Sequence, residues 1–384
     1  MTGWSRRAAL RGSVAMAATF GASCVPGEGF GQKLRDAECG AGAEGLADQP
    51  PIAAVASRQG RWFGTAVKDP LFTDMPFQQL VLEQCNMLVC TYSMKWEFLQ
   101  PQPGRFDFRL ADRYVDFAER HGMPIRGHTL VWDHAVPGWL GEAIRQDGLA
   151  TLERHVRGVA AHYAGRIHSW DVVNEAVWPA DGRADRLKVT PLLEAIGPSY
   201  IDAAFLAARE ADPKALLYYN CNPAPYGRRN DRAHFEGVVA LLEGLKSRDV
   251  PVQGAGLQSH LSAALDDDFD EKTLAWFFQR VTDLGLEAMV TELDVTDKGV
   301  AADFELRDRR VAATYRRFLD VALSFPAVKG VLVWGLTDRY GGLDRWPRPD
   351  GWAVRGLPFD ACMQPKPARD AIVEAFLAHD AKRP

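Results

Sequence analysis

The sequence lacks an excess of charge of either sign. Its 384 residues include 45 basic and 50 acidic side chains, which gives a formal net charge of −5 at pH 7. Proteins that bind nucleic acids or other polyanions usually present a strongly basic surface. The balance therefore predicts no nucleic-acid partner and favours a neutral ligand. Eleven tryptophans supply aromatic surface, which serves both protein cores and the apolar faces of ligand rings.

Cysteine is scarce and lacks the spacing of a metal site. The six cysteines stand at positions 24, 39, 85, 90, 221 and 362, and no two of them form a Cys-x-x-Cys pair. Structural zinc sites usually draw ligands from such pairs, so we expect no metal. Cys85 and Cys90 lie on one apolar run, "CNMLVC", and an extended strand would keep their side chains apart.

Long apolar runs are also missing beyond the N-terminus. No stretch there has the roughly 20 apolar residues of a transmembrane helix, so we expect no membrane span. Residues 1–23 combine Arg6 and Arg7 with an Ala-rich run that ends in small residues, which is typical of a twin-arginine export signal. The sequence thus predicts an exported protein, periplasmic or extracellular. An ordinary basic leader is the alternative, and a lipid anchor at Cys24 is a weaker one.

Sequence repeats with a period of about 20 to 50 residues are absent, which argues against a solenoid. Residues 24–57 are rich in Gly, Ala and Pro and are predicted to form a linker. In residues 58–380, apolar runs alternate with amphipathic stretches that indicate helices. The eight runs are "RWFGTAV", "CNMLVC", "PIRGHTLVW", "IHSWDVVN", "ALLYYN", "GAGLQSHL", "EAMVTEL" and "GVLVWGL". This alternation predicts an α/β fold, a (β/α)8 TIM barrel that forms a single catalytic domain.

Polar side chains gather at the ends of these runs. In a (β/α)8 barrel the carboxyl ends of the strands form the rim that carries the active site. Acids, amides, imidazoles and indoles occupy this position: His128, Asn174, Glu175, Gln258, His260, Glu292 and Trp334. Helix capping alone would not place so varied a set on one rim. The set therefore predicts an active site.

Two carboxylates, Glu175 and Glu292, end the fourth and the seventh run, which lie on opposite sides of a small barrel. Cleavage of a glycosidic bond requires a proton for the leaving oxygen and a nucleophile or an activated water for the anomeric carbon. Two carboxyl groups supply both, so the sequence predicts no cofactor.

The surroundings of Glu292 predict a nucleophile. Asp294 follows two residues later, and His260 lies on the preceding run. An imidazole held between two carboxylates would keep its neighbour ionised and oriented. Glu292 would then be the ionised partner of the pair.

The surroundings of Glu175 predict an acid. Aromatic surface from Trp132 or Trp334 would favour the protonated form of this carboxyl group. Asn174 precedes it and is placed to hydrogen-bond a sugar hydroxyl, an interaction that strengthens in the transition state of glycosidases.

Eight ordered motifs resemble a known family. "WFGTAV", "MKWEFLQPQPGRFDF", "GHTLVW", "WDVVNEA", "GLQSHL", "TELDV", "VWGLTD" and "QPKPA" occur in the order found in glycoside hydrolase family 10, the retaining endo-β-1,4-xylanases and their relatives. The resemblance implies a (β/α)8 barrel with Glu175 as acid/base and Glu292 as nucleophile. It also implies a sugar site lined by Lys95, His128, Trp132, Asn174, Gln258, His260 and Trp334, with Asp294 supporting His260.

Departures from the family pattern affect the glycone side, which holds the sugars on the non-reducing side of the cleaved bond. Where the family carries a Glu-Asn pair that grips the next sugar there, this chain has Thr91 and Tyr92. The Tyr92 ring either exposes an aromatic face to the substrate or turns inward to fill space. An aromatic lid expected after "GLTD" is also missing, and its possible replacements are Tyr340, Trp346 and Trp352.

We therefore predict a monomeric retaining endo-glycosidase, a xylanase-like enzyme that cleaves β-1,4 bonds through a covalent glycosyl-enzyme intermediate. Its partner would be a polysaccharide or oligosaccharide, and the leading candidate is xylan or decorated xylan. The changed glycone side leaves another β-1,4-glycan, such as an exopolysaccharide or a cellulose-like chain, as the alternative. A carbohydrate-binding barrel without activity is the alternative from another class. The presence of both glutamates with their supporting residues argues against it.

Overall fold

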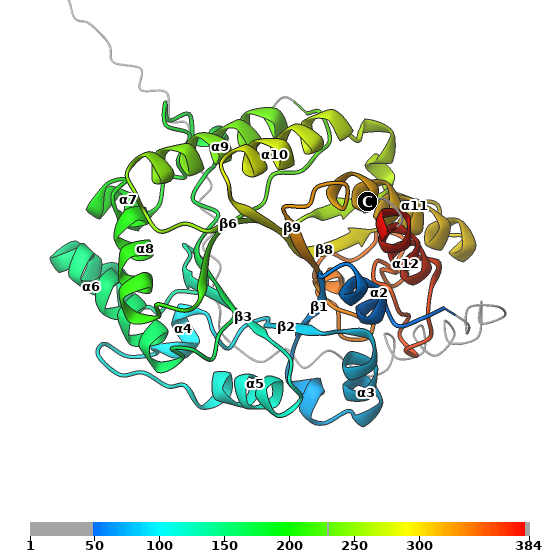
Figure 1. The fold of residues 1–384 in the computed structure, drawn as a ribbon, viewed down its shortest axis with the longest axis horizontal. Coiled ribbons are helices and arrows are strands. Elements are labelled where there is room, and N and C mark those ends of the chain that lie inside the picture. Colours follow the sequence, from blue (N-terminus) through cyan, green and yellow to red (C-terminus); the bar gives the residue numbers. More distant parts are fainter. Residues whose placement is uncertain (1–48, 229, 381–384) are drawn as a thin grey trace, which may run out of the picture.

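Eight parallel strands close into a barrel in the computed structural model, which describes residues 49–228 and 230–380 (Figure 1). These strands are β1 (Trp62–Val67), β2 (Met87–Cys90), β3 (Ile125–Val131), β4 (Ser169–Asn174), β5 (Leu216–Cys221), β6 (Gly254–Leu257), β8 (Glu287–Thr296) and β9 (Val328–Val333). Neighbours pair in chain order, β6 pairs with β8, and β1 pairs with β9 to close the ring. The predicted (β/α)8 barrel is confirmed.

A helix follows each barrel strand and lies on the outside of the ring (Figure 1). These helices are α3 (Met75–Gln84), α5 (Arg109–Arg120), α6 (Leu140–His162), α8 (Tyr200–Ala211), α9 (Asp231–Ser247), α10 (Glu271–Asp283), α11 (Phe304–Ala322) and α12 (Pro367–Asp380). Shorter elements within the connections are η1 (Asp69–Phe72), α4 (Trp96–Leu99), η2 (Pro179–Asp181), α7 (Pro191–Ile196), β7 (His260–Ser262), η3 (Ala263–Asp268) and η4 (Leu343–Arg345). The connections after the strands carry most of the site.

The helices bury one face each, because the strands they cover lie on one side only. In α5, Ala111, Tyr114, Val115 and Ala118 are buried and recur every three or four positions. Gly122 follows this helix with a φ of 65°, a left-handed conformation that ends helices readily at glycine. The strands are instead buried along nearly their whole length, as expected for a parallel sheet covered on both faces.

Helix α2 (Ile52–Arg58) begins within the range 24–57 that the sequence assigned to a linker, and all but its last residue lie in that range. Its residues Ile52, Val55 and Ala56 are buried in the main hydrophobic core, so the folded domain begins earlier than predicted. Seven residues are too few to display a helical period, which explains why the sequence pattern missed this helix. The predicted export segment, Cys24 and the linker up to residue 48 lie outside the described residues.

Side chains fill the barrel interior beneath the rim. A buried cluster there consists of Ala66, Met87, Val89, Tyr218, Met289 and Leu332. This packing closes the barrel from below, as in other (β/α)8 barrels, and leaves the carboxyl ends of the strands for ligand binding.

Two expectations from the sequence, on membrane helices and on Cys85 and Cys90, concern the described part of the chain. None of its helices combines the length and apolar content needed to cross a membrane. Cys85 and Cys90 do not pair with each other, as predicted from their position along one run, and both are free and buried.

Candidate active site

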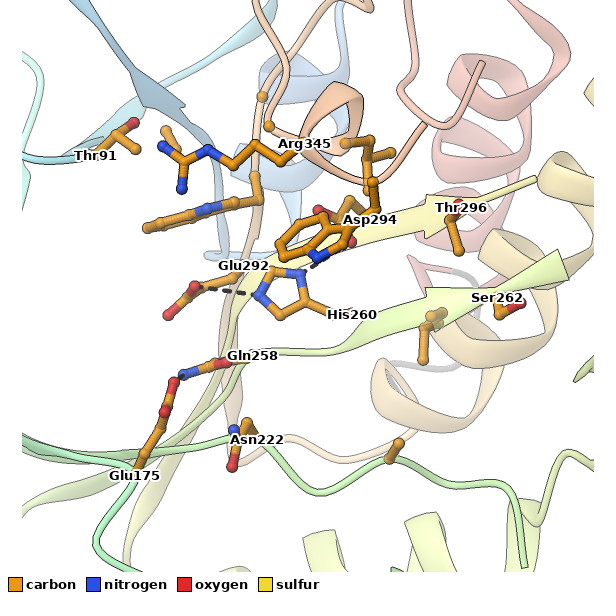
Figure 2. Close-up of a pocket in the computed structure, with 18 of the residues that line it drawn as sticks. Thr91, Glu175, Asn222, Gln258, His260, Ser262, Glu292, Asp294, Thr296 and Arg345 are labelled. Carbon is orange, nitrogen blue, oxygen red and sulfur yellow. Dashed lines mark hydrogen bonds and ion pairs between the residues drawn. The ribbon is translucent and has the colours of Figure 1, made fainter. Parts of the chain in front are cut away.

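A pocket of about 800 Å³ opens at the carboxyl ends of the barrel strands. Its lining includes all ten side chains singled out from the sequence: Lys95, His128, Trp132, Asn174, Glu175, Gln258, His260, Glu292, Asp294 and Trp334. Several of them are drawn in Figure 2. The fold therefore brings the whole set together, although its members come from strands far apart in the sequence.

Glu292 lies on β8 and is only 4% exposed. Its Oε1 accepts a hydrogen bond of 2.8 Å from Asn220 Nδ2, and its Oε2 lies 3.3 Å from His260 Nε2. Burial alone would raise the pKa of this carboxyl group. The charge of His128, the hydrogen bond from His260 and the ammonium of Lys95 outweigh burial and lower the pKa to about 2. Glu292 is therefore ionised at neutral pH.

His260 stands between two carboxylates (Figure 2). Strand β7 pairs with β8 so that His260 lies opposite Asp294, and Nδ1 is 2.9 Å from Asp294 Oδ1. Its Nε2 faces Glu292. Burial lowers the pKa of His260, but the two carboxylates raise it well above the ordinary value of 6.5. The side chain is 42% exposed toward the pocket, so solvent screens part of this effect. The two short contacts still favour the charged imidazolium.

Glu175 follows β4 with a φ of 58°, in the left-handed region. This conformation costs a non-glycine residue about 1 to 3 kcal/mol and is typical of functional positions. A backbone hydrogen bond of 3.0 Å to the Asn220 carbonyl holds it. Trp132 Nε1 donates to Oε2 over 3.0 Å, and Gln258 Nε2 donates to Oε1 over 2.8 Å. Asn174 Nδ2 donates to Oε1 over a longer 3.4 Å, so three donors fix this carboxyl group in the pocket.

Three carboxamides connect the two glutamates. The Oδ1 of Asn174 accepts hydrogen bonds from Asn220 Nδ2 over 2.9 Å and from Gln258 Nε2 over 3.2 Å. Asn220 also donates to Glu292, and Gln258 also donates to Glu175. The chain of amides therefore sets the position of one carboxylate relative to the other.

Asn220 was not among the residues predicted from the sequence. Its Oδ1 accepts a 2.7 Å hydrogen bond from Thr291 Oγ1, which orients the amide toward Glu292. A Cβ at Gly256 would meet this oxygen at 2.3 Å, so a glycine is required beside it. Asn220 ends the run "ALLYYN", the same position that identified the other rim residues. The signal was present in the sequence.

A buried ion pair beneath the rim orients His128. Arg126 and Asp171 lie inside neighbouring strands and pair with each other. His128 Nδ1 is 3.0 Å from Asp171 Oδ2, so this nitrogen carries a proton and donates to the carboxylate. The sequence signal is a pair of opposite charges within two apolar runs, "PIRGHTLVW" and "IHSWDVVN". The sequence analysis did not use it.

Lys95 lies against two aromatic rings at the end of the pocket. Its Nζ is 4.5 Å from the ring centroid of Trp132 and 5.2 Å from that of Tyr92. Burial lowers the pKa of Lys95, whereas Glu292, Cys90 and Glu175 raise it. The ammonium group contributes positive charge beside both glutamates.

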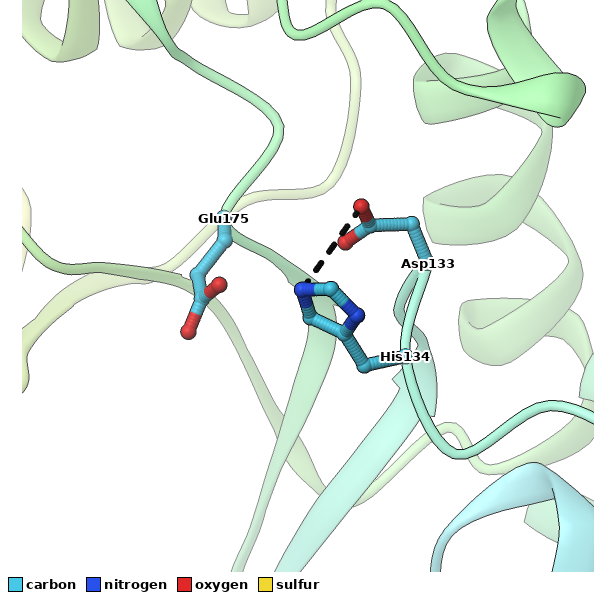
Figure 3. Close-up of side chains that lie close together, drawn as sticks. All are labelled: Asp133, His134 and Glu175. Atoms are coloured by element: carbon cyan, nitrogen blue, oxygen red, sulfur yellow. Dashed lines mark ion pairs between the residues drawn. The ribbon is translucent and has the colours of Figure 1, made fainter. Parts of the chain in front are cut away.

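Asp133, His134 and Glu175 form a compact group of possible metal ligands, with donor atoms within 4.8 Å of one another (Figure 3). Lys188 already supplies positive charge there. Its Nζ lies 2.8 Å from Asp133 Oδ2, 2.9 Å from Oδ1, and 3.9 Å from Glu175 Oε2. We interpret the group as an ion-pair network, because a cation would have to displace this ammonium.

We expect a chelator to leave activity unchanged. Lys188 supplies the positive charge that a divalent cation would bring to Asp133 and Glu175. Hydrolysis rates before and after dialysis against EDTA measure this. A loss of activity that zinc, calcium or magnesium restores would contradict the interpretation.

The three candidates for the missing aromatic lid differ in their surroundings. Tyr340 packs edge-on against Phe77, and its hydroxyl donates a 2.5 Å hydrogen bond to Asp74. Trp352 packs against a phenylalanine of α11 and is not part of the pocket lining. Trp346 lines the pocket and is 63% exposed. Only Trp346 therefore combines an exposed indole with a position at the pocket.

Several proteins similar to this chain are named xylanases. The chain is 35% identical over 311 residues to a β-1,4-xylanase of Dictyoglomus thermophilum, which covers 78% of this chain and 84% of that protein. The native xylanase 10B of Thermotoga maritima superposes with a TM-score of 0.78 at 30% identity, covering 87% of this chain and 100% of that one. Xylanase 10B of Thermotoga petrophila RKU-1 in complex with xylobiose superposes with a TM-score of 0.77 at 29% identity. The superposition covers 88% of this chain and 100% of that one.

The family model of glycosyl hydrolase family 10 matches residues 51–375. This range contains the barrel and every side chain of the site described above. The chain therefore belongs to glycosyl hydrolase family 10 and is an enzyme related to the endo-1,4-β-xylanases.

Proposed function

We propose that this enzyme hydrolyses the β-1,4 bonds of xylan or decorated xylan with retention of anomeric configuration, with Glu292 as nucleophile and Glu175 as acid/base. One observation carries the proposal. A buried, ionised carboxylate shares a pocket with a second carboxylate, and the amide chain through Asn220, Asn174 and Gln258 joins them. The xylanases to which the chain is similar support xylan as the backbone.

In the first step, Glu292 attacks the anomeric carbon while Glu175 gives its proton to the leaving oxygen. The carbon–oxygen bond to the leaving sugar breaks, its electron pair stays on that oxygen, and a glycosyl ester forms. Trp132 and Gln258 hold the carboxyl group that loses the proton. Asn220 and His260 keep Glu292 oriented toward the sugar until it reacts.

In the second step, Glu175 takes a proton from water as the water oxygen attacks the anomeric carbon. The ester bond breaks, and Glu292 regains its negative charge. Two inversions give net retention. His260 and Lys95 favour this step, because they stabilise the carboxylate that departs.

A 2-deoxy-2-fluoro xyloside with a good leaving group tests the proposal. We expect it to trap the glycosyl ester, and mass spectrometry should locate one added sugar on the peptide that contains Glu292. Proton NMR of early products should show the β anomer first. An α anomer first would mean inversion, and a chain that neither takes the label nor hydrolyses any β-1,4-glycan would be a binding protein.

Replacing Asp294 by Asn is expected to move the alkaline limb of kcat/KM to lower pH. The substitution removes the carboxylate nearest to His260 Nδ1, so the pKa of this imidazole falls. Deprotonated His260 no longer places a positive charge beside Glu292. Rates on an aryl xyloside from pH 5 to 10 measure the limb, and Asp116→Asn on the outer helix α5 serves as control. An unchanged limb would contradict this role.

The raised pKa of His260 also predicts how the stability of the folded state changes with pH. A raised pKa stabilises the folded state fully below the unfolded value of about 6.5, and this contribution is lost as pH rises through the folded pKa of His260. The melting temperatures of the Asp294→Asn variant and the unaltered chain should therefore differ most in acid and converge in alkali. A difference that grows with pH would contradict the sign.

We also propose that the protein is exported and monomeric, on the basis of the paired Arg6 and Arg7 and of the predicted one-domain organisation. Cell fractionation of the unaltered chain and of an Arg6→Lys/Arg7→Lys variant tests export. We expect the variant to stay in the cytoplasm, since the twin-arginine route requires this pair. Light scattering of the purified protein tests the monomer.

A further inference from the structure

Cations and aromatic rings gather at the end of the pocket beyond Glu292. Figure 2 shows Thr91 and Arg345 on one side of Glu292, with Glu175 and Asn222 on the other. Glu175, the acid, protonates the oxygen of the leaving sugar, so the end of the pocket with Glu175 holds the sugars that depart. The end with Arg345 therefore holds the glycone.

Arg345 and Lys68 bring positive charge to this end. Arg345 belongs to η4, and its guanidinium carbon is 5.1 Å from the ring centroid of Tyr92. Lys68 follows β1, and its Nζ donates a 3.0 Å hydrogen bond to the Gly341 carbonyl. Both side chains line the pocket. The carboxylate of Asp344 interacts electrostatically with Lys68. The two cations, Lys68 and Arg345, together with this one carboxylate carry a net positive charge.

The segment that carries Arg345 is anchored firmly. Arg348 is 4% exposed and donates to the carbonyl oxygens of Asp297 and Val300 over 2.5 and 2.8 Å. It also pairs with Asp350 over 2.5 Å. These contacts fix the chain just after Arg345 and Trp346, so both are presented to the pocket from a held backbone.

Thr91 and Tyr92 offer neither a carboxylate nor an amide to a sugar at the same place. The Thr91 hydroxyl is buried and donates to the Val67 carbonyl over 3.0 Å. The Tyr92 ring contacts Lys95, Arg345 and Phe98. The ring lines the pocket, so it does more than fill space, and it lies against two cations. The glycone end thus offers the positive charge of Arg345 and Lys68, whereas the Thr91 hydroxyl is already engaged.

Guanidinium groups bind carboxylates with two parallel hydrogen bonds, and indole rings pack against the apolar faces of pyranoses. We propose that the glycone end binds a uronic acid unit of the glycan, with its carboxylate on Arg345 and Lys68 and its ring against Trp346. This inference rests on the proposed glycosidase function and specifies its substrate as an acidic, decorated β-1,4-xylan. Tyr92 is a positioning residue that holds the Arg345 guanidinium.

A matched pair of substrates tests the charge directly. One is a xylo-oligosaccharide that carries a uronic acid, and the other is the same compound with the carboxyl group reduced to a hydroxymethyl. The unaltered enzyme should favour the acid in kcat/KM by about tenfold to hundredfold, the range of one charge-assisted hydrogen bond. Arg345→Gln should bring the ratio close to one, because kcat/KM falls more on the acid than on the reduced compound.

Arg228→Gln is the matched control, because Arg228 lines the same pocket from the loop after β5. It should keep the preference of the unaltered enzyme for the acid. Tyr92→Phe should also keep this preference, and Tyr92→Ala should lose most of it, since only the alanine removes the ring under Arg345. A preference that survives Arg345→Gln, or that Arg228→Gln abolishes, would overturn the proposal.

The products locate the decoration. Mass spectrometry should find the uronic acid on the fragment with the new reducing end, which comes from the glycone side. Its presence only on the other fragment, or equal rates on the acid and the reduced compound, would overturn the inference and leave a xylanase. If no xylan compound is hydrolysed, the proposed function fails instead. Calorimetric binding of the same pair to the Glu292→Gln variant then decides the inference by itself, with weaker binding of the reduced compound expected.

Discussion

Replacing Glu292 by Gln should abolish the hydrolysis of xylan and leave the barrel folded. A glutamine amide does not form the glycosyl ester, and loss of a nucleophile in other covalent enzymes lowers kcat by about 10⁶-fold. The amide keeps the size of the carboxylate and still accepts the hydrogen bond from Asn220. It loses the ion pair with His260, which we expect to cost about 1 to 3 kcal/mol of stability. Steady-state rates and thermal melting measure the two effects.

Glu287→Gln on the same strand is the matched control. Glu287 begins β8, and its Oε2 accepts a 2.8 Å hydrogen bond from the Tyr218 hydroxyl, away from the pocket lining. This variant should hydrolyse xylan at a rate close to that of the unaltered enzyme. Substantial turnover by Glu292→Gln, with the protein free of deamidated chain by mass spectrometry, would refute the nucleophile.

The barrel and most of the predicted pocket residues were accessible from the sequence because both follow local patterns, whereas Lys95 came from the family resemblance alone. Apolar runs mark strands buried on both faces, and polar residues after them mark the rim, whichever strands are involved. Glu175 and Glu292 are 117 positions apart, yet their place at two strand ends sufficed to bring them into one pocket. Helix α2 was missed because its short length carries no period.

Contacts between distant loops were not accessible in the same way. Arg345 meets Tyr92, and Lys188 meets Asp133, across connections whose paths no local pattern specifies. The amide of Asn220 is a different case, since its strand-end position was visible and only its partner was not. Sequence thus indicated which side chains reach the pocket, and the structure gave the pairs that orient them.

Replacing Glu175 by Ala should slow the hydrolysis of xylan far more than that of an aryl xyloside with a good leaving group. Removal of a general acid costs about 10² to 10⁴ in rate, and a leaving group such as dinitrophenolate departs without protonation. With the aryl substrate, the variant should therefore form the glycosyl ester quickly and hydrolyse it slowly. An initial burst of phenolate is expected. Glu194→Ala, exposed on α7, is the control and should show neither effect.

Azide should restore part of the Glu175→Ala rate on the aryl substrate. The substitution leaves space beside Trp132 Nε1 and Gln258 Nε2, two donors that then lose the carboxylate as acceptor. Lys188 Nζ lies 3.9 Å from the carboxylate oxygen that is removed, so positive charge attracts a small anion to this space. Azide attacks without needing a base, and attack from the face opposite the ester gives the β-xylosyl azide. Equal losses on both substrates without azide rescue would assign the proton transfer to another group, and an α-xylosyl azide would contradict the covalent intermediate.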